Sequence, residues 1–133
     1  MIAVTGGNGK LGRAVVARLR EEGHDVIVLD RVAGGGATLV DFTDYGQTVD
    51  ALLGVNDRHA GLDAIVHLAA IPAPGIMSDA ETFRNNMLTT FNVFKGAERA
   101  GIRRIVYRSR LSTRFQTPPR SRRSQRSPGT HPR

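Results

Sequence analysis

A glycine cluster near the amino terminus constrains the fold of this 133-residue chain more than any other feature. Residues 1–5 form a short apolar run with β-branched side chains, and Thr-Gly-Gly-Asn-Gly-Lys-Leu-Gly occupies positions 5–12. From Lys10 onward apolar residues recur at helical spacing, until Gly23. The pattern predicts a strand, a tight turn and then a helix of about three turns.

The glycine spacing points to phosphate chemistry. Glycines at positions 6, 9 and 12 allow a tight turn and let the backbone approach a pyrophosphate, whose charge the helix N-terminus then holds. Asp30 follows Gly12 by 18 residues, at the end of the next apolar run. An acid at that place accepts hydrogen bonds from the adenosine ribose hydroxyls. The spacing predicts a dinucleotide site; the alternative is a turn that only packs helix on strand.

The rest of the first 107 residues alternates between two patterns. Apolar runs at 26–29, 37–40, 64–68 and 104–107 predict strands, whereas residues 43–53 and a stretch from Ser78 or Asp79 to Ala100 predict helices. Runs that are apolar on both faces suit a parallel sheet covered by helices. We expect an α/β fold, a Rossmann-like doubly wound parallel sheet of about five strands. The six residues between Asp30 and Ala37 are few for a helical crossover, so a loop crossover is expected there.

The net charge of +7 belongs to one end of the chain. Residues 108–133 hold eight arginines and no acid, whereas residues 1–107 have a net charge of −1. That tail also holds five serines, four prolines and three threonines, and only Leu111 and Phe115 are sizeable apolar residues. Because the tail cannot bury enough apolar surface to offset its ordering entropy, we expect it to be disordered, and residues 1–107 to form the single domain.

Composition narrows the class of protein further. The chain has no cysteine, which excludes disulfides, thiolate metal sites and cysteine nucleophiles, and no metal site is predicted. No apolar run approaches the length of about 18–20 residues that a membrane helix needs, and no signal pattern follows Met1. We therefore expect a cytoplasmic protein without a membrane partner.

Five segments together resemble a known family. They are the Thr-Gly-x-x-Gly-x-x-Gly motif, Asp30-Arg31, Asp41-Phe42, His67-Leu68-Ala69-Ala70, and the stretch from Asn85-Asn86 to Tyr107. Over residues 1 to about 107 the chain is similar to the extended short-chain dehydrogenases/reductases, the nicotinamide-dependent epimerases and dehydratases. The resemblance implies a cofactor site made of Gly6, Asn8, Gly9, Lys10, Leu11 and Gly12 along the pyrophosphate, Asp30 and Arg31 at the ribose, Asp41 and Phe42 at the adenine edge, Leu68, Ala69 and Ala70 as a wall beside the cofactor, and Asn85 on the following helix.

Several of these positions have a second interpretation. Asp41 could instead cap the helix that begins near residue 43. His67 lies in a buried strand and is expected to be a hydrogen-bonded core residue rather than an acid or base. In the family an asparagine holds the next helix in place; Asn85 matches it, Asn86 is a near alternative, and both could be surface polar residues. The Arg31 guanidinium could stack on adenine or meet a 2′-phosphate, but the adjacent acid would repel that phosphate, which favours NAD over NADP.

The family's catalytic group is missing from this sequence. It consists of Tyr-x-x-x-Lys with a serine or threonine, yet neither tyrosine, at positions 45 and 107, has a lysine four residues further on. The position of the catalytic hydroxyl falls on Arg110, beside Ser109, so no catalytic residue is assigned.

The abrupt change in composition after Tyr107 suggests a shifted reading frame or a truncated gene. The exposed last strand would then favour self-association.

Three functions compete at this point. The first is a dinucleotide-binding fragment of an NAD-dependent epimerase/dehydratase or oxidoreductase, not catalytically competent as this chain. The second is a non-catalytic module that senses the dinucleotide. The third is nucleic-acid binding through the arginine tail, although the sequence offers no aromatic array beyond Phe115, and no specific nucleic-acid partner is expected.

Overall fold

A parallel five-stranded sheet forms the centre of the molecule. The structure is a computed structural model and describes residues 1–55 and 58–108. The strand order is β3-β2-β1-β4-β5, and every neighbouring pair is parallel. The strands are β1 (Ile2–Thr5), β2 (Val26–Asp30), β3 (Thr38–Leu39), β4 (Ala64–His67) and β5 (Arg104–Tyr107). The expected Rossmann-like sheet is confirmed. The tail predicted to be disordered is residues 108–133, and all of it except Arg108 lies outside the described residues.

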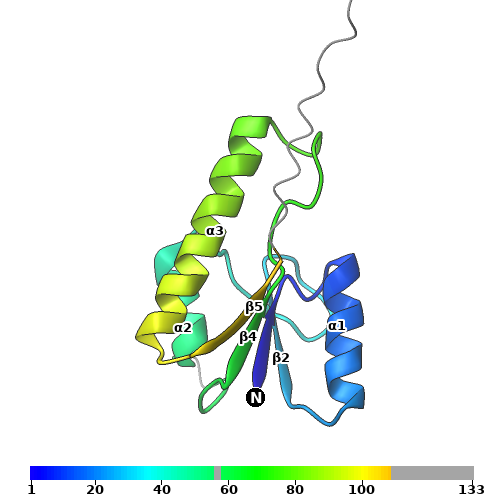
Figure 1. Ribbon diagram of the computed structural model, residues 1–133, viewed down its shortest axis with the longest axis vertical. Coiled ribbons are helices and arrows are strands. Elements are labelled where there is room, and N and C mark those ends of the chain that lie inside the picture. The colour runs from blue at the N-terminus through cyan, green and yellow to red at the C-terminus, as the bar shows by residue number, and fades with distance from the viewer. Residues whose placement is uncertain (56–57, 109–133) are drawn as a thin grey trace, which may run out of the picture.

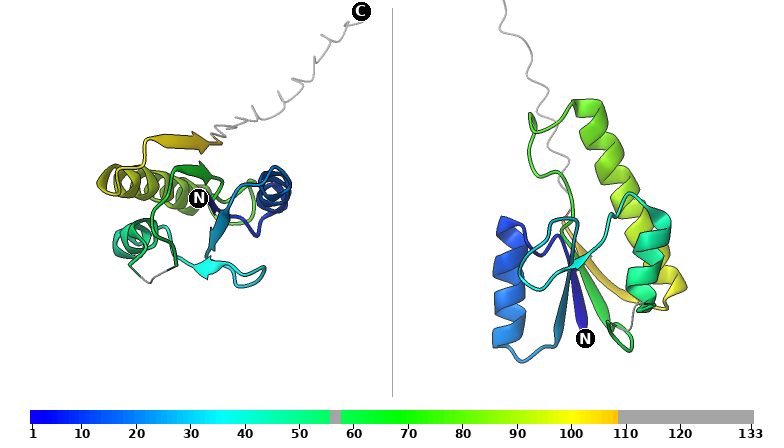
Figure 2. Two further views of the ribbon diagram at one scale, coloured as in Figure 1. Left: turned by 90° about the horizontal axis from the view of Figure 1, so that it is seen from below. Right: turned by 180° about the vertical axis from the view of Figure 1, so that it is seen from behind.

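Helices cover both faces of this sheet (Figures 1 and 2). Helix α1 (Lys10–Glu21) lies on one face, and α2 (Tyr45–Leu53) and α3 (Asp79–Arg99) lie on the other. The reason is the right-handedness of parallel crossovers: β1 to β2 steps one way along the sheet, whereas β3 to β4 and β4 to β5 step the other way. None of the helices within residues 1–55 and 58–108 is long and apolar enough to cross a membrane.

The connection from β2 to β3 is the expected loop crossover. It contains no helix, and β3 pairs with the end of β2 through Leu29 with Thr38 and Asp30 with Leu39. The strand is shorter than the predicted run at 37–40, because Gly34, Gly35 and Gly36 all have positive φ and keep the chain turning until residue 37.

Two apolar clusters hold the layers together. Beneath α2 and α3, Ala3, Leu29 and Ile65 pack with side chains from those helices, such as Leu52 and Val93. Beneath α1 the buried cluster is smaller and consists of Val4, Val16 and Val28. Neighbours such as residues 3 and 4 belong to different clusters because successive side chains of a strand point to opposite faces.

Two of the three described helices begin with a side-chain cap. The Asp44 carboxylate caps α2 by accepting from the backbone N–H of Gln47 at 2.9 Å, so the suggestion that Asp41 caps this helix is wrong. Asp41 accepts instead from the N–H and the hydroxyl of Thr43, and these bonds lower the pKa of its carboxyl. Helix α3 has a full capping box, in which Ser78 and Glu81 satisfy each other's backbone N–H.

Strand β5 is the outer strand on its side of the sheet. Ile105 is partly buried against the larger cluster, while Val106 and Tyr107 are 67% and 52% exposed. The Tyr107 ring keeps one edge-to-face contact, with Phe94 of α3, at a centroid distance of 5.2 Å. The exposed apolar surface of this edge is therefore centred on residues 106 and 107.

Candidate dinucleotide site

The glycine cluster packs as closely as its sequence predicts. A Cβ on Gly12 would lie 2.2 Å from the carbonyl oxygen of Gly6, and one on Gly6 would lie 2.7 Å from the backbone nitrogen of Ala69. Gly6 also has a φ of +68°, which L side chains rarely adopt. Only glycine fits at these two positions, so the turn lies directly against α1 on one side and the chain after β4 on the other.

The N-terminus of α1 is open. Its cap residue is Gly9, no side chain caps the helix, and its first turn holds no acidic residue. The first backbone N–H groups of a helix have no acceptor within the helix. Together with the positive end of the helix dipole, they form a site for an anion beside the glycine turn.

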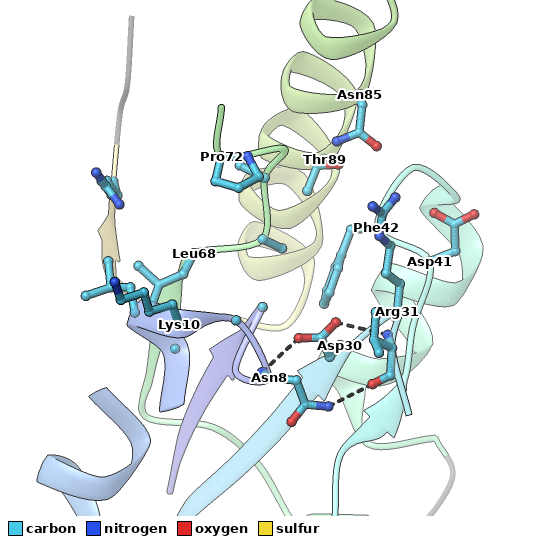
Figure 3. Close-up of a pocket in the computed structure, with 18 of the residues that line it drawn as sticks. Asn8, Lys10, Asp30, Arg31, Asp41, Phe42, Leu68, Pro72, Asn85 and Thr89 are labelled. Carbon is cyan, nitrogen blue, oxygen red and sulfur yellow. Dashed lines mark hydrogen bonds between the residues drawn. The ribbon is translucent and has the colours of Figure 1, made fainter. Parts of the chain in front are cut away.

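Asp30 braces the glycine turn from the end of β2. Its side chain is 7% exposed and accepts from the N–H of Asn8 at 2.9 Å and from the N–H of Val32 at 3.0 Å, one bond to each carboxylate oxygen (Figure 3). Because a carboxylate oxygen has two acceptor positions, each oxygen keeps one for a further donor. Asp30 can therefore accept from a pair of hydroxyls while it holds the turn.

Asn8 lines the cavity, but its side chain is directed at the loop after β2. Its amide Nδ2 donates to the carbonyl oxygen of Val32 at 2.8 Å (Figure 3) and to that of Gly34 at 3.1 Å. These bonds tie the glycine turn to the loop crossover. No local pattern in the sequence indicates this role, because it depends on the positive-φ path of residues 34–36.

A cavity of about 740 Å³ opens at the carboxyl ends of β1, β2 and β4 and brings the predicted site together. Every residue predicted for the cofactor lines it: Gly6, Asn8, Gly9, Lys10, Leu11, Gly12, Asp30, Arg31, Asp41, Phe42, Leu68, Ala69, Ala70 and Asn85. Ala14, Val32, Thr43, Pro72, Thr89 and Arg108 complete the lining and were not predicted. Thr89 lies one helical turn after Asn85, a spacing that could have identified it.

The two adjacent asparagines of α3, Asn85 and Asn86, have different partners. Asn86 accepts from the N–H of Ile71 at 2.8 Å and donates to its carbonyl oxygen at 3.3 Å, which fastens α3 to the loop after β4. Asn85 lines the cavity and donates to Asn86 at 3.1 Å. The interpretation of both as surface residues is wrong. A further asparagine, Asn92, was missed; it is buried and donates to the carbonyl oxygen of Phe42 at 2.9 Å.

His67 is the buried core histidine that was expected. It is 3% exposed, and its Nδ1 lies 2.7 Å from the hydroxyl oxygen of Thr5. Burial lowers the pKa of His67 to about 4, so the imidazole is neutral at pH 7. Within residues 1–55 and 58–108, no group of three potential ligands could hold a metal ion.

Comparisons with known proteins agree with this geometry. Residues 2–124 match the sequence model of the NAD dependent epimerase/dehydratase family, and the chain belongs to that family. The UDP-glucose 4-epimerase of Halalkalibacterium halodurans is 33% identical over 117 residues, which are 84% of this chain and 35% of that protein.

Solved structures show the same partial overlap. A short-chain dehydrogenase/reductase superfamily protein from Agrobacterium tumefaciens, crystallised with bound NAD, matches with a TM-score of 0.65 and 34% identity over 80% of this chain and 31% of its own. A UDP-N-acetylglucosamine 4-epimerase from Bacillus cereus matches with a TM-score of 0.65 and 32% identity over 80% of this chain and 34% of its own. This chain spans about a third of the length of these relatives.

Proposed function

We propose that this chain binds a nicotinamide dinucleotide in the cavity at the carboxyl edge of the sheet. The observation that carries the proposal is the junction of β1 and α1: a glycine turn packed without room for a Cβ leads into an uncapped helix N-terminus. The pyrophosphate would lie against this N-terminus. The adenosine ribose would donate its hydroxyls to Asp30, which stands at the next strand end.

The residues present fit this cofactor. The open N–H groups at Lys10 to Gly12 suit a pyrophosphate, which carries negative charge but donates no hydrogen bonds. The adenine edge would be formed by Asp41 and Phe42, and the wall by residues 68–70, all of which line the cavity. When bound, the nicotinamide ring supplies reversible hydride transfer; the residues named here bind and orient the cofactor.

NAD is the cofactor we propose in preference to NADP. Asp30 is nearly buried at the cavity wall, and its negative charge would repel a 2′-phosphate at the ribose. Arg31 lines the same cavity and is exposed, so its guanidinium could offset part of that repulsion or stack on adenine. The preference therefore depends on the balance between these two neighbours.

We infer that the chain binds without turnover. Its sequence has no Tyr-x-x-x-Lys, and it spans about a third of its relatives, whose epimerase or dehydrogenase activity would belong to the whole protein. A cytoplasmic location remains a prediction from the sequence.

Isothermal titration calorimetry with NAD, NADH and NADP tests this proposal. We expect one site for NAD with a Kd on the order of tens of micromolar or weaker, because residues beyond this chain would complete the cleft in its relatives. Absence of NAD binding by the folded chain would contradict the proposed function. Hydride transfer above background with sugar nucleotides or hydroxyacids would contradict the absence of turnover.

Self-association through β5 is part of the same proposal. The outer strand presents Val106 and Tyr107 to solvent beside unpaired backbone groups, which favours pairing with a second copy of the chain. Salt should strengthen the association, because it screens the repulsion between the arginines of residues 108–133 in two copies of the chain. The screening length is about 8–10 Å at physiological ionic strength. Light scattering against salt concentration measures this, and a monomer at every salt concentration would overturn it.

A further inference from the structure

A buried hydroxyl joins the glycine turn to the wall of the cavity. Thr5, the last residue of β1, is fully buried, and its Oγ1 accepts from the backbone N–H groups of Leu68 and Ala69, both at 3.2 Å. Leu68 donates as well to the carbonyl oxygen of Thr5 at 3.1 Å. Among the described residues, the Thr5 hydroxyl is the one hydrogen-bond acceptor recorded for the N–H of Ala69.

These contacts determine where the proton of Thr5 goes. A hydroxyl oxygen accepts two hydrogen bonds and donates one. Since the two N–H groups occupy both acceptor positions, the hydroxyl proton is donated to the remaining neighbour, Nδ1 of His67, at 2.7 Å. His67 must therefore be the tautomer that carries its proton on Nε2, which lies 3.4 Å from the hydroxyl oxygen of Thr90 on α3.

The wall held in this way touches the phosphate-binding turn directly. A Cβ on Gly6 would lie only 2.7 Å from the nitrogen of Ala69, so the two backbone segments leave no room for a side chain there. Both Gly6 and Ala69 line the cavity (Figure 3 shows Leu68 beside the turn). A shift of the Ala69 backbone would therefore change the shape of the phosphate end of the site.

We propose that His67 is a positioning residue for the dinucleotide site: by accepting the hydroxyl proton of Thr5 on Nδ1, it turns the oxygen of Thr5 toward the amides that hold the cavity wall against the glycine turn. The proposal rests on the proposed function, because it assigns the purpose of the wall to dinucleotide binding. It adds a role for a side chain that does not itself line the cavity.

Paired substitutions separate positioning from stability. Thr5→Ser keeps the hydroxyl, whereas Thr5→Val removes it at nearly constant shape. His67→Asn keeps an acceptor near the place of Nδ1, whereas His67→Leu removes it. Ile65→Val is the matched control, since it removes a buried methyl group from the same strand, two residues away, and touches none of these hydrogen bonds.

The first measurement is amide hydrogen exchange without ligand, on variants shown by their melting curves to be folded. We expect Thr5→Val and His67→Leu to speed exchange at Ala69 by about tenfold relative to the amides of β4, while the other three variants leave that ratio unchanged. Uniform acceleration over the whole strand would mean that His67 and Thr5 act only on global stability.

The second measurement is NAD affinity by calorimetry. The two disrupting variants should bind about tenfold more weakly, with Thr5→Ser and His67→Asn close to the unmodified chain. If the unmodified chain does not bind NAD, the proposed function fails while the exchange result still tests the hydrogen-bond arrangement. If it binds NAD and both disrupting variants bind equally well, the inference about His67 is wrong.

Discussion

The N-termini of α1 and α3 differ in whether side chains satisfy their first backbone N–H groups. Helix α3 begins with Ser78 and Glu81, whose side chains occupy its free N–H groups, and with acids in its first turn. Helix α1 begins at Gly9 with neither a capping side chain nor an acid. A capped end contributes stability to the fold, whereas an open end beside a cavity keeps its donors for an anion. The difference separates a structural helix end from a binding one.

Displacing the glycine turn at the open end of α1 should have the largest effect. In Gly12→Ala the new Cβ would lie 2.2 Å from the oxygen of Gly6 and 2.7 Å from the Cα of Gly7, so the backbone turn must move. We expect NAD binding to disappear and the free energy of unfolding to fall by about 3 kcal/mol. Calorimetry and urea unfolding measure the two effects. Gly46→Ala in α2 is the control, since its Cβ would meet only a side-chain oxygen.

Acid should destabilise the surroundings of His67 and the capping box of α3 in different pH windows. Burial lowers the pKa of His67 to about 4 from an ordinary value of 6.5, so the unfolded chain binds the proton first. Stability is complete above pH 6.5 and should fall by about 3 kcal/mol between pH 6.5 and 4. Hydrogen bonds from Ser78 lower the pKa of Glu81 below 4.5, so the capping box is lost only at lower pH.

Urea unfolding between pH 7.5 and 3 tests this order, and His67→Asn is the control. That variant should remove most of the slope above pH 4.5 and leave the acid limb of Glu81 in place. An unchanged slope would show that another group titrates in this window.

Asp30→Ala removes the acid that stands opposite the open helix end. The loss of a charge-assisted bond to the ribose should cost about 1.5–3 kcal/mol of NAD affinity, roughly ten- to a hundredfold, and much less of NADP affinity. Titrations with both cofactors measure the ratio. Equal losses would mean that Asp30 acts on both cofactors alike, through the glycine turn that it braces, and not through the ribose.

Ser78→Ala should affect only the structural end. Removing the cap of α3 should lower the free energy of unfolding by about 1 kcal/mol and leave the NAD Kd unchanged. Thermal unfolding and calorimetry measure the pair of effects, with Ser78→Asp as a variant that keeps an acceptor. Weaker NAD binding in the alanine variant would couple this end to the cavity and erase the contrast between the helices.

Gly9→Ser would make the open end resemble the capped one. Gly9 has a φ of −67°, which serine adopts easily, although its Cβ would lie 3.3 Å from the oxygen of Gly6. We expect stability to change by only about a few tenths of a kcal/mol and NAD binding to weaken by about threefold, because the new hydroxyl competes for the free N–H groups. Unchanged affinity would mean that these groups do not bind the cofactor.

The sequence by itself determined the alternation of strands and helices, the glycine turn and, through its resemblance to the family, most of the residues that line the cavity. These features are local: apolar periodicity defines each element, and the glycines and Asp30 sit at strand ends, which meet at one edge of a parallel sheet. The capping serine of α3 was predictable for the same reason, since its partner Glu81 lies three residues away.

Only the tertiary structure decided which polar groups meet across the sheet. Asn8 bonds to the loop after β2, Asn86 to Ile71 and Thr5 to residues 67–69, all between segments separated by 15 to 64 positions in the chain. Such partners depend on register and loop path, which no local pattern records. Asp41 shows the same limit at short range, because a two-residue difference in where α2 begins made Asp44 the cap instead.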